Sequence, residues 1–516
     1  MAAQFANLLL LLLAATCSSH DISVTAKSPP SDHLSGTEPS PQKRLYPPFG
    51  DDLPPLNHRQ IDVVQDVPES GPAATLGAQH DENDTLIHAP NITAEPREPT
   101  ERKVQSPNQD YARYADISWD YLGLVVVLSN SEDDEPPSQA PPVSDSALVT
   151  VADVERVARL KLEPQARRYF FSGSDRQQTL KENTEAFKRL RFRPKLLVDV
   201  SKVDTTTTVL GHRISMPIGF SPTALQKLAH NDGEVATAQA AQDARIVMIL
   251  SSLSTTTLEE VRTRAPRALL WFQAYLFRDR SVTEWLVKRA AKAGYSAIVL
   301  TADSPVVGHK LGPVKNRFDL PPNVTFANLQ GRNDKSKVQS GNQENVDQSI
   351  SRSVSWEDIG WLKRITGLPV VVKGLLTREA ALQAYRHGAA AILVSNHGGR
   401  QLDGTPASIE ALPEIVSAVG DRLEVYLDSG VRSGADVVKA LSLGARAVFL
   451  GRPAIWGLAY NGKKGVDRVL DILRSELERT MQLLGCKNSS SLNSAYVVHK
   501  DHYARTRWKN YPRHEL

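Results

Sequence analysis

From residue 217 onward the chain repeats one unit, a short apolar run without polar alternation followed by an Ala-rich amphipathic stretch. Strands that are apolar on both faces are buried on both sides, as in parallel sheets covered by helices. Stretches such as 282–293 and 378–387 supply the helical crossovers. Eight such runs predict a (β/α)8 TIM barrel, of the α/β class, rather than an open sheet. The runs are 217–220, 246–250, 268–272, 297–300, 369–372, 391–394, 425–427 and 447–450.

One interval between these runs, about 310–355, is much longer than the others and rich in Gly, Asn and Lys. Long loops in compact domains are usually functional, so this interval is predicted to be an active-site loop. Helical spacing also covers 151–162. The folded barrel domain is therefore expected over 146–500, with 501–516 as a C-terminal tail.

The segment 20–145 has a different composition, rich in Pro, Ser, Asp and Glu, and holds more than half of the 32 prolines. Such a composition cannot bury enough apolar surface to fold, which predicts a long, largely disordered Pro-rich leader. The apolar stretch 119–128 is the exception. It either docks on a folded surface or forms an isolated edge strand.

The first 19 residues predict a signal peptide, because the apolar run 6–15 is too short to span a bilayer and small residues follow it. No Lys or Arg precedes the run, so a buried N-terminal helix is the alternative. A secreted glycoprotein is expected, and four Asn-x-Ser/Thr sequons fit that route: Asn83, Asn91, Asn323 and Asn488. The last four residues, 513–516, resemble a retention signal of the endoplasmic reticulum, which is the weaker alternative.

Bulk composition excludes several classes of function. The net charge of +3 is too small to predict binding to nucleic acid. After residue 20 no apolar run approaches the roughly 18 residues of a membrane span. With Cys17 and Cys486 as the only cysteines, a disulfide framework and a cysteine-based zinc site are both excluded, and no metal is expected.

Polar residues follow every predicted strand. In barrels of this type the chemistry lies at the carboxyl ends of the strands, so these residues are candidates for one site. In chain order they are Ser221 to Ala224, Ser251 and Ser252, Gln273 and Tyr275, Thr301 and Asp303, Lys373, Ser395 and His397, Asp428 to Gly430, and Gly451 and Arg452.

The Gly-rich segment 395–404 places His397 three residues before Arg400, directly after a buried strand. Imidazole is a base near neutral pH, and guanidinium matches a carboxylate with two parallel hydrogen bonds. A base beside a carboxylate clamp is what removal of a proton next to a carboxylate requires. The segment therefore predicts an enzyme.

Two further features indicate a bound phosphate and a bound ring. The small residues of 428–434 and 450–453 match the phosphate site that barrels form after strands seven and eight, with Arg452 adding charge. Lys373 projects from a buried strand, where an unpaired ammonium is costly. Its partner is either a carboxylate or an electron-rich ring such as a flavin.

Specific short motifs lie between about 152 and 486. They are Tyr169 to Gly173, Pro222 to Ala224, Gln273 to Tyr275, Leu300 to Asp303, Val372 to Gly374, Ser395 to Asp403, Leu427 to Arg432, and Gly451 with Arg452. On these motifs the chain resembles the FMN-dependent 2-hydroxy-acid oxidase/dehydrogenase family, which includes glycolate oxidase, lactate oxidase and the flavin domain of flavocytochrome b2. The segment Ser-Asn-His-Gly-x-Arg-Gln-Leu-Asp is highly specific to that family.

The resemblance implies catalytic and substrate-binding roles. His397 would take the proton from the 2-hydroxy carbon or oxygen, while Asp303 would orient the imidazole and raise its pKa. Arg400 and Tyr169 would bind the carboxylate, and Tyr275 would contact the hydroxyl or the developing oxyanion. For Tyr169 a packing role is the alternative, since it precedes the barrel strands.

The resemblance also implies that the barrel domain binds FMN. Lys373 would lie at the N1–O2 edge of the flavin and stabilise negative charge there. The other residues implied to contact the ring, ribityl chain or phosphate are Pro222, Thr223, Ala224, Ser251, Gln273, Thr301, Ser395, Asp428, Gly430, Arg432, Gly451 and Arg452.

The chain departs from the family pattern at several positions, among them His309 and the apolar Val306 and Val307, which alter the surface near the site. Lys310 stands where the family often has a second Arg near the substrate, and it provides a point charge without a bidentate fork. Leu253 stands where glycolate-specific members carry a Trp. The pocket is therefore expected to be roomier, and the substrate larger than glycolate.

These features predict FMN-dependent oxidation of an (S)-2-hydroxy acid to the 2-oxo acid, with the handedness taken from the family. The leader has no His-Pro-Gly-Gly haem motif, so O2, giving H2O2, is the simplest electron acceptor, with a separate acceptor as the alternative. Other interpretations are amine or imine oxidation, isomerisation, or a secreted flavin-binding protein with a decayed site. The family commonly forms tetramers, so a homotetramer is the implied assembly.

Overall fold

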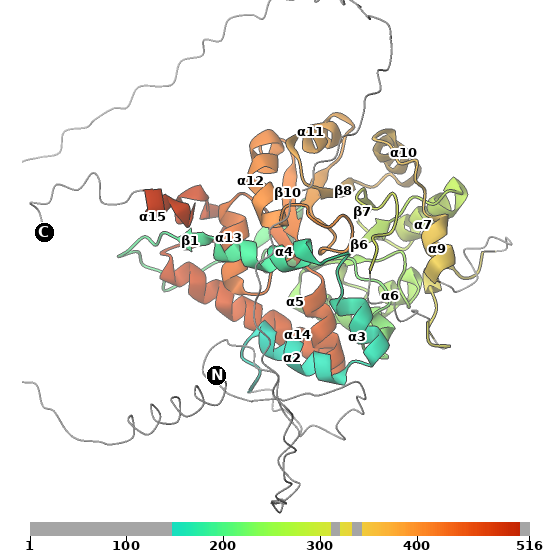
Figure 1. Cartoon of the computed structure of the whole chain (residues 1–516), viewed down its shortest axis with the longest axis horizontal. Helices are drawn as coiled ribbons and strands as arrows, with labels where there is room; N and C mark the ends of the chain where they lie inside the picture. Colours follow the sequence, from blue (N-terminus) through green and yellow to red (C-terminus); the bar gives the residue numbers. More distant parts are fainter. Residues whose placement is uncertain (1–146, 311–319, 323, 333–342, 506–516) are drawn as a thin grey trace, which may run out of the picture. The chain divides into compact units, whose positions relative to one another are not determined.

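The computed structural model describes residues 147–310, 320–322, 324–332 and 343–505 (Figure 1). The predictions made for the signal peptide, for the leader 20–145 and for the retention-like end lie outside these residues. So do three of the sequons, Asn83, Asn91 and Asn323. None of the helices in the described part combines the length and the apolar character needed to cross a membrane.

The centre of the fold is a closed barrel of eight parallel strands, which confirms the predicted barrel. Going round the barrel, the strand order is β10-β11-β4-β5-β6-β7-β8-β9, so each strand lies beside its neighbours in the sequence. The strands are β4 Ile218–Phe220, β5 Val247–Leu250, β6 Leu269–Ala274, β7 Ile298–Thr301, β8 Val370–Leu375, β9 Ala391–Val394, β10 Glu424–Asp428 and β11 Ala447–Leu450.

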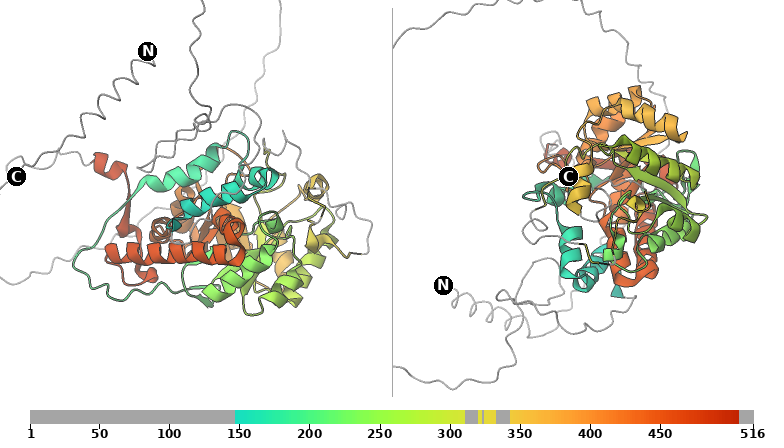
Figure 2. Two further views of the ribbon diagram at one scale, coloured as in Figure 1. Left: turned by 90° about the horizontal axis from the view of Figure 1, so that it is seen from below. Right: turned by 90° about the vertical axis from the view of Figure 1, so that its right-hand side faces the viewer.

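Helices surround these strands, as the predicted crossovers require (Figures 1 and 2). Their apolar faces pack on the outer face of the barrel, where both sides of most strands are buried. They are α5 Gly233–Ala244, α6 Leu258–Arg264, α7 Arg280–Lys292, α10 Glu357–Thr366, α11 Arg378–Arg386, α12 Ser408–Val419, α13 Gly434–Ser442 and α14 Arg452–Leu483. The last of these bends at Asn461 and Gly462, whose backbone angles are not helical.

The amino end of the barrel is closed by packed side chains. Above this end, Trp271, Tyr426 and Phe449 fill the middle of the interior, with ring centroids 5.6–5.8 Å apart, and Phe449 reaches the level of Asp428. The hairpin of β2 Thr207–Val209 and β3 His212–Ile214 packs against them. Because this end is filled, a ligand can enter the barrel only from the carboxyl ends of the strands.

Three helices precede the barrel: α2 Val151–Lys161, α3 Pro164–Phe171 and α4 Gln178–Lys188. The first confirms the helix predicted over 151–162, and Arg468 of α14 fastens its start by donating to the Leu148 carbonyl. The strands β1 Leu190–Phe192 and β12 Val497–His499 pair antiparallel, which brings the segment after α4 beside the segment that follows α14.

The remaining elements are short. The interval predicted as an active-site loop contains η3 Ala327–Leu329 and α9 Gln343–Ser349 in its described parts. The others are η2 Gln226–Leu228, η5 Ser489–Ser491, η6 Ser494–Tyr496 and α15 Asp501–Arg505.

Candidate active site

A cavity of about 430 Å³ opens at the carboxyl end of the barrel. Residues at or just after the ends of all eight strands line it, so the strand ends converge as the sequence predicted. A concave site of this size holds a small organic ligand. The predicted site residues on its wall are Tyr169, Pro222, Thr223, Ala224, Ser251, Gln273, Tyr275, Thr301, Lys373, His397, Arg400, Asp428, Gly430, Arg432, Gly451 and Arg452.

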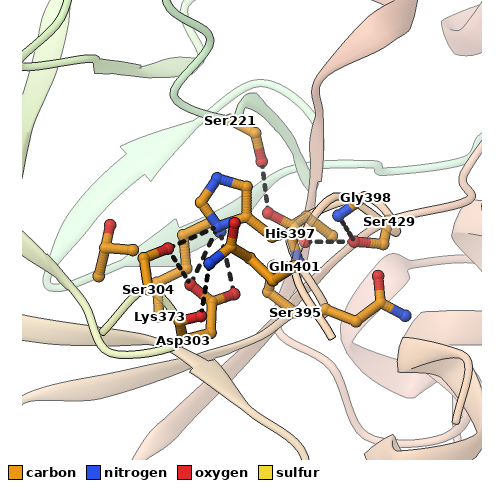
Figure 3. Close-up of polar contacts among 12 residues, drawn as sticks. Ser221, Asp303, Ser304, Lys373, Ser395, His397, Gly398, Gln401 and Ser429 are labelled. Atoms are coloured by element: carbon orange, nitrogen blue, oxygen red, sulfur yellow. Dashed lines mark hydrogen bonds and ion pairs between the residues drawn. The ribbon is translucent and has the colours of Figure 1, made fainter. Parts of the chain in front are cut away.

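His397 and Asp303 form a hydrogen-bonded pair at this cavity (Figure 3). The Nδ1 atom of His397 lies 3.0 Å from Oδ1 of Asp303, and the hydroxyl of Ser304 lies 3.5 Å from the same nitrogen. Asp303 is not on the cavity wall, so it acts behind the imidazole. Gly374 leaves room for it: with φ at +110°, a Cβ there would lie 2.6 Å from Asp303 side-chain carbons.

The electrostatics of this pair differ from the expectation that Asp303 would leave His397 with a raised pKa. Burial and the nearby Lys373 ammonium outweigh the carboxylate, and the pKa of His397 is lowered from its ordinary value. Burial also favours a raised pKa for Asp303, but Lys373 and His397 together hold the pKa of Asp303 at about 2. At neutral pH the pair is therefore a neutral imidazole bonded to a carboxylate, as a base requires.

Arg400 enters the same cavity and is fixed by the end of α3. Its NH1 group donates to the carbonyls of Tyr169 at 2.7 Å and Ser172 at 3.0 Å. Its guanidinium lies 5.0 Å from the centre of the Tyr169 ring. These contacts fix the guanidinium plane before a carboxylate arrives, so little rotamer freedom is lost when the anion binds.

The loop that carries His397 and Arg400 is held in an uncommon conformation, with φ of His397 at +61°. Ser395 does not line the cavity; instead its hydroxyl accepts the His397 backbone N–H at 3.0 Å. The side-chain amides of Asn396 and Asn183 exchange two hydrogen bonds, of 2.8 and 2.7 Å. Helix α4, which carries Asn183, therefore fixes the loop from outside the barrel.

Lys373 is buried, with 3% of its surface exposed, and its Nζ has no hydrogen-bond partner among the described residues. The nearest charge is Oδ2 of Asp303 at 4.0 Å, which itself accepts no hydrogen bond there. A salt bridge this long leaves the buried ammonium incompletely compensated. Of the two partners the sequence allowed, an electron-rich ring in the cavity fits this ammonium best.

The wall beside Lys373 is polar and ordered. The Oε1 atom of Gln273 accepts the backbone N–H of Ser252 at 3.0 Å, and its Nε2 donates to the Thr301 hydroxyl at 2.9 Å. On the other side the Asp428 carboxylate accepts the hydroxyls of Ser221 and Ser429, each at 2.8 Å. Such groups suit the carbonyls of a flavin ring and the hydroxyls of a ribityl chain.

The predicted phosphate loops both border the cavity, but their arginines are already engaged. Arg432 lies 4.8 Å from the centre of the Trp456 ring. Arg452 donates to the carbonyls of Phe170, Gly398 and Ser172, at 2.8, 3.0 and 3.0 Å. Burial lowers the pKa of both guanidiniums, which an incoming phosphate would offset. Arg452 thus positions the His397 loop and α3 as well as adding charge.

Some residues on the wall were not predicted. Asp347 and Ile350 come from α9 and the residue after it, inside the interval that the sequence did predict as an active-site loop. Gln401 belongs to the family-specific motif, and its amide spans the neighbouring loop by donating to the Asp303 and Val306 carbonyls, each at 2.9 Å. No local pattern singled out Asp347, because its place at the site depends on the bridge between Ile350 and the distant Phe277.

Comparison with known proteins agrees with this geometry. The family described as FMN-dependent dehydrogenase matches residues 158–499. A 2-hydroxyacid oxidase 1 of Mus musculus is 48% identical over 357 residues, covering 68% of this chain and 96% of that protein. The glycolate oxidase of Spinacia oleracea is 48% identical over 355 residues, covering 68% and 96%.

Solved structures give the same result. A mandelate oxidase with (S)-4-hydroxymandelic acid is 38% identical with a TM-score of 0.64, covering 68% of this chain and 99% of that chain. A mutant of the active chimera of (S)-mandelate dehydrogenase is 37% identical with the same TM-score and coverage. The family resemblance and the FMN cofactor are thereby confirmed. This chain is an FMN-dependent oxidoreductase and belongs to the FMN-dependent dehydrogenase family.

Proposed function

We propose that the protein oxidises (S)-2-hydroxy acids to 2-oxo acids, with O2 as the final electron acceptor and H2O2 as the second product. The observation that supports this most is the arrangement of His397, Arg400 and Lys373 on the wall of one cavity. A base, a carboxylate fork and an incompletely compensated ammonium are the groups this reaction needs. The chemistry that bound FMN supplies is acceptance of the two electrons that leave the substrate.

His397 is the base in this reaction. Since the Asp303 carboxylate can only accept a hydrogen bond, Nδ1 of the neutral imidazole carries the proton and Nε2 is the basic nitrogen. Nε2 takes the proton from the 2-hydroxy oxygen or from the carbon that bears it. Asp303 then stabilises the imidazolium that results.

Substrate binding uses the guanidinium of Arg400 for the carboxylate. Tyr169 and Tyr275 stay protonated through the physiological range, because burial raises the pKa of both phenols. Both hydroxyls are therefore neutral and can donate to the substrate oxygens. Ser251, Gln273 and Thr301 would hold the flavin ring beside Lys373, and the loops after β10 and β11 would hold the phosphate.

The substrate is larger than glycolate in this proposal. Leu253, Val307 and Ile350 give the wall an apolar surface that a hydrogen-only substituent would leave uncovered. The similar proteins include several named glycolate oxidase and others named mandelate oxidase, and these two acids carry a small and a large 2-substituent. An apolar 2-substituent fits this wall better than none.

The test uses the purified, FMN-loaded full chain. Anaerobic addition of glycolate, 2-hydroxyoctanoate or mandelate is expected to bleach the flavin absorbance, fastest with the larger S acids. Bleaching by 2-amino acids alone would instead support amine oxidation, and no bleaching by either class would contradict the proposal.

The electron acceptor needs its own measurement, because the similar proteins include both oxidases and a dehydrogenase. We expect one O2 consumed and one H2O2 formed per 2-oxo acid. Turnover with an artificial dye but not with O2 would replace O2 by a separate acceptor.

Secretion and assembly are also proposed. The apolar run 6–15 and the sequons support entry into the secretory pathway. Asn488, the one sequon in the described residues, is half-buried, and its side-chain oxygen accepts the Ser490 hydroxyl at 3.0 Å. A glycosidase-sensitive mass and a cleaved N-terminus in secreted protein would support the route, and light scattering at four times the chain mass would support a homotetramer.

A further inference from the structure

Lys310 adds a second cation to the wall that carries Arg400. It is half-buried and lines the same cavity as Arg400 and His397. The backbone just before Lys310 is hydrogen-bonded to the loop that carries Arg400, because the Gly308 N–H donates to Oε1 of Gln401 at 3.0 Å. A Cβ at Gly308 would collide with the Arg400 carbonyl, so the two backbones touch. The backbone that leads into Lys310 therefore lies against the loop that carries Arg400.

The same segment is fastened on its other side. The carbonyl of His309 accepts the Asp175 N–H at 2.9 Å, and the His309 imidazole lies 3.4 Å from the Asp175 carboxylate. The connection between α3 and α4 thus holds residue 309 while the loop after β9 holds residue 308. The position of Lys310 is fixed by two elements rather than by its own loop alone.

The charges that face Lys310 are of both signs. Burial and the like charge of Arg400 lower the pKa of Lys310, and Asp347 of α9 only partly opposes them, so this pKa is about 7. Lys310 makes no hydrogen bond to the described residues, which leaves the ammonium available to a ligand. Before an anionic ligand binds, Lys310 is therefore close to half-protonated at neutral pH.

Three other titratable side chains on the cavity wall stay in one state between pH 7 and 9. The pKa of His397 is lowered by burial, so the imidazole is neutral in this range. Burial raises the pKa of Tyr169 and Tyr275, so both phenols keep their protons. His309 also borders the cavity, and the variant His309→Gln distinguishes its contribution from that of Lys310.

We propose that Lys310 is a proton-linked anchor for the substrate carboxylate. Its ammonium binds the anion together with Arg400, and above neutral pH anion binding is accompanied by uptake of one proton at Nζ. The inference rests on the proposed function, in which a 2-hydroxy acid anion binds at Arg400. It gives the two cations different roles, since a guanidinium in a protein is not deprotonated, whereas the Lys310 amine gains its proton when the ligand binds.

Linkage gives the sign and size of the effect. An anion beside Nζ raises the pKa of Lys310, so affinity is fully present below the pKa of the free enzyme and falls as pH rises through the range above it. With a free-enzyme pKa of about 7, the Kd of a monoanion is expected to rise about tenfold between pH 6 and pH 8.

The experiment measures binding without turnover. The probe is 2-hydroxy-2-methylpropanoate, a monoanion over this pH range that has no hydrogen on C2 to lose. Calorimetry on the FMN-loaded full chain at pH 8, in buffers of different ionisation enthalpy, is expected to show close to one proton taken up per probe bound. In parallel, KM for the best 2-hydroxy acid is expected to rise over the same pH range while kcat changes little.

Four variants make the test specific. Lys310→Arg should bind the probe with a Kd that does not change from pH 6 to pH 8 and without proton uptake. Lys310→Met should bind it more weakly at pH 6, again without pH dependence. His309→Gln should keep the proton uptake, and Lys202→Met, which removes an exposed lysine outside the cavity, should behave as wild type.

The outcomes also separate this inference from the proposed function. Proton uptake that persists in Lys310→Met, uptake that is lost in His309→Gln, or a wild-type Kd and KM that do not change with pH would each overturn the role of Lys310. If 2-hydroxy acids still bleach the flavin, only this inference has failed. If none of them bleaches it, the proposed function has failed.

Discussion

The two ends of the barrel are built from the same strands but differ in how completely their side chains are packed and paired. Toward the amino end, Trp271 and Tyr426 pack on each other and on the β2–β3 hairpin, and Phe449 separates them from the cavity that it also lines. At the carboxyl end, His397 and Lys373 border the cavity, and the latter has no hydrogen-bond partner in the described residues. One end stabilises the fold, whereas the other leaves charge uncompensated for a ligand.

The largest expected effect is at the carboxyl end. His397→Gln removes the base but keeps a polar side chain of similar size, so turnover should fall by about 10²- to 10⁴-fold. FMN content and the free energy of unfolding should stay close to wild type. Flavin absorbance, chemical denaturation and anaerobic bleaching rates check this, and turnover within a few-fold of wild type would break the contrast between the ends.

The matching change at the amino end is Trp271→Ala. It empties a fully buried site, which costs about 3–5 kcal/mol of unfolding free energy for a Trp-to-Ala substitution. Turnover per bound flavin should change far less than in His397→Gln, because Trp271 does not line the cavity. Denaturant titration measures the first, and kcat per bound flavin the second. Trp271→Phe, which keeps most of the volume, is the control and should lose less stability.

A smaller effect is expected on the pH dependence of kcat/KM, which reports the charges at the carboxyl end. The base works only when neutral, so the acid limb of kcat/KM should lie below pH 6.5, because burial and Lys373 lower the pKa of His397. Asp303 acts in the opposite direction, so Asp303→Asn should move that limb to still lower pH. A pH–rate profile of both proteins checks the sign. An acid limb that moved upward would contradict the assignment of the pair.

The sequence predicts the barrel well because its signal is local. Buried parallel strands are apolar throughout, and the amphipathic crossovers repeat between them, so the strand ends and their polar residues can be placed along the chain. The family-specific motif then brings His397 and Arg400 together. The structure confirms the fold and collects most of the candidate site on one wall.

What the sequence could not predict depends on contacts between distant segments. Two hydrogen bonds from Arg452 form only once α3 has packed beside the barrel. Their acceptors, the carbonyls of Phe170 and Ser172, lie 282 and 280 residues earlier in the chain. Asp347 reaches the wall because α9 lies beside the segment after β6, where Ile350 forms a bridge with Phe277. The direction of the His397 pKa shift depends on burial and on Lys373, neither of which can be weighed from spacing.

The end of α3 has a consequence for how small this enzyme can be made. Its last carbonyls, at Tyr169, Phe170 and Ser172, are acceptors for both Arg400 and Arg452. A fragment that started at the first barrel strand would deprive two guanidiniums of these acceptors. The smallest active fragment must therefore begin before Pro164. The eight residues of α3 are as necessary to the enzyme as the barrel strands.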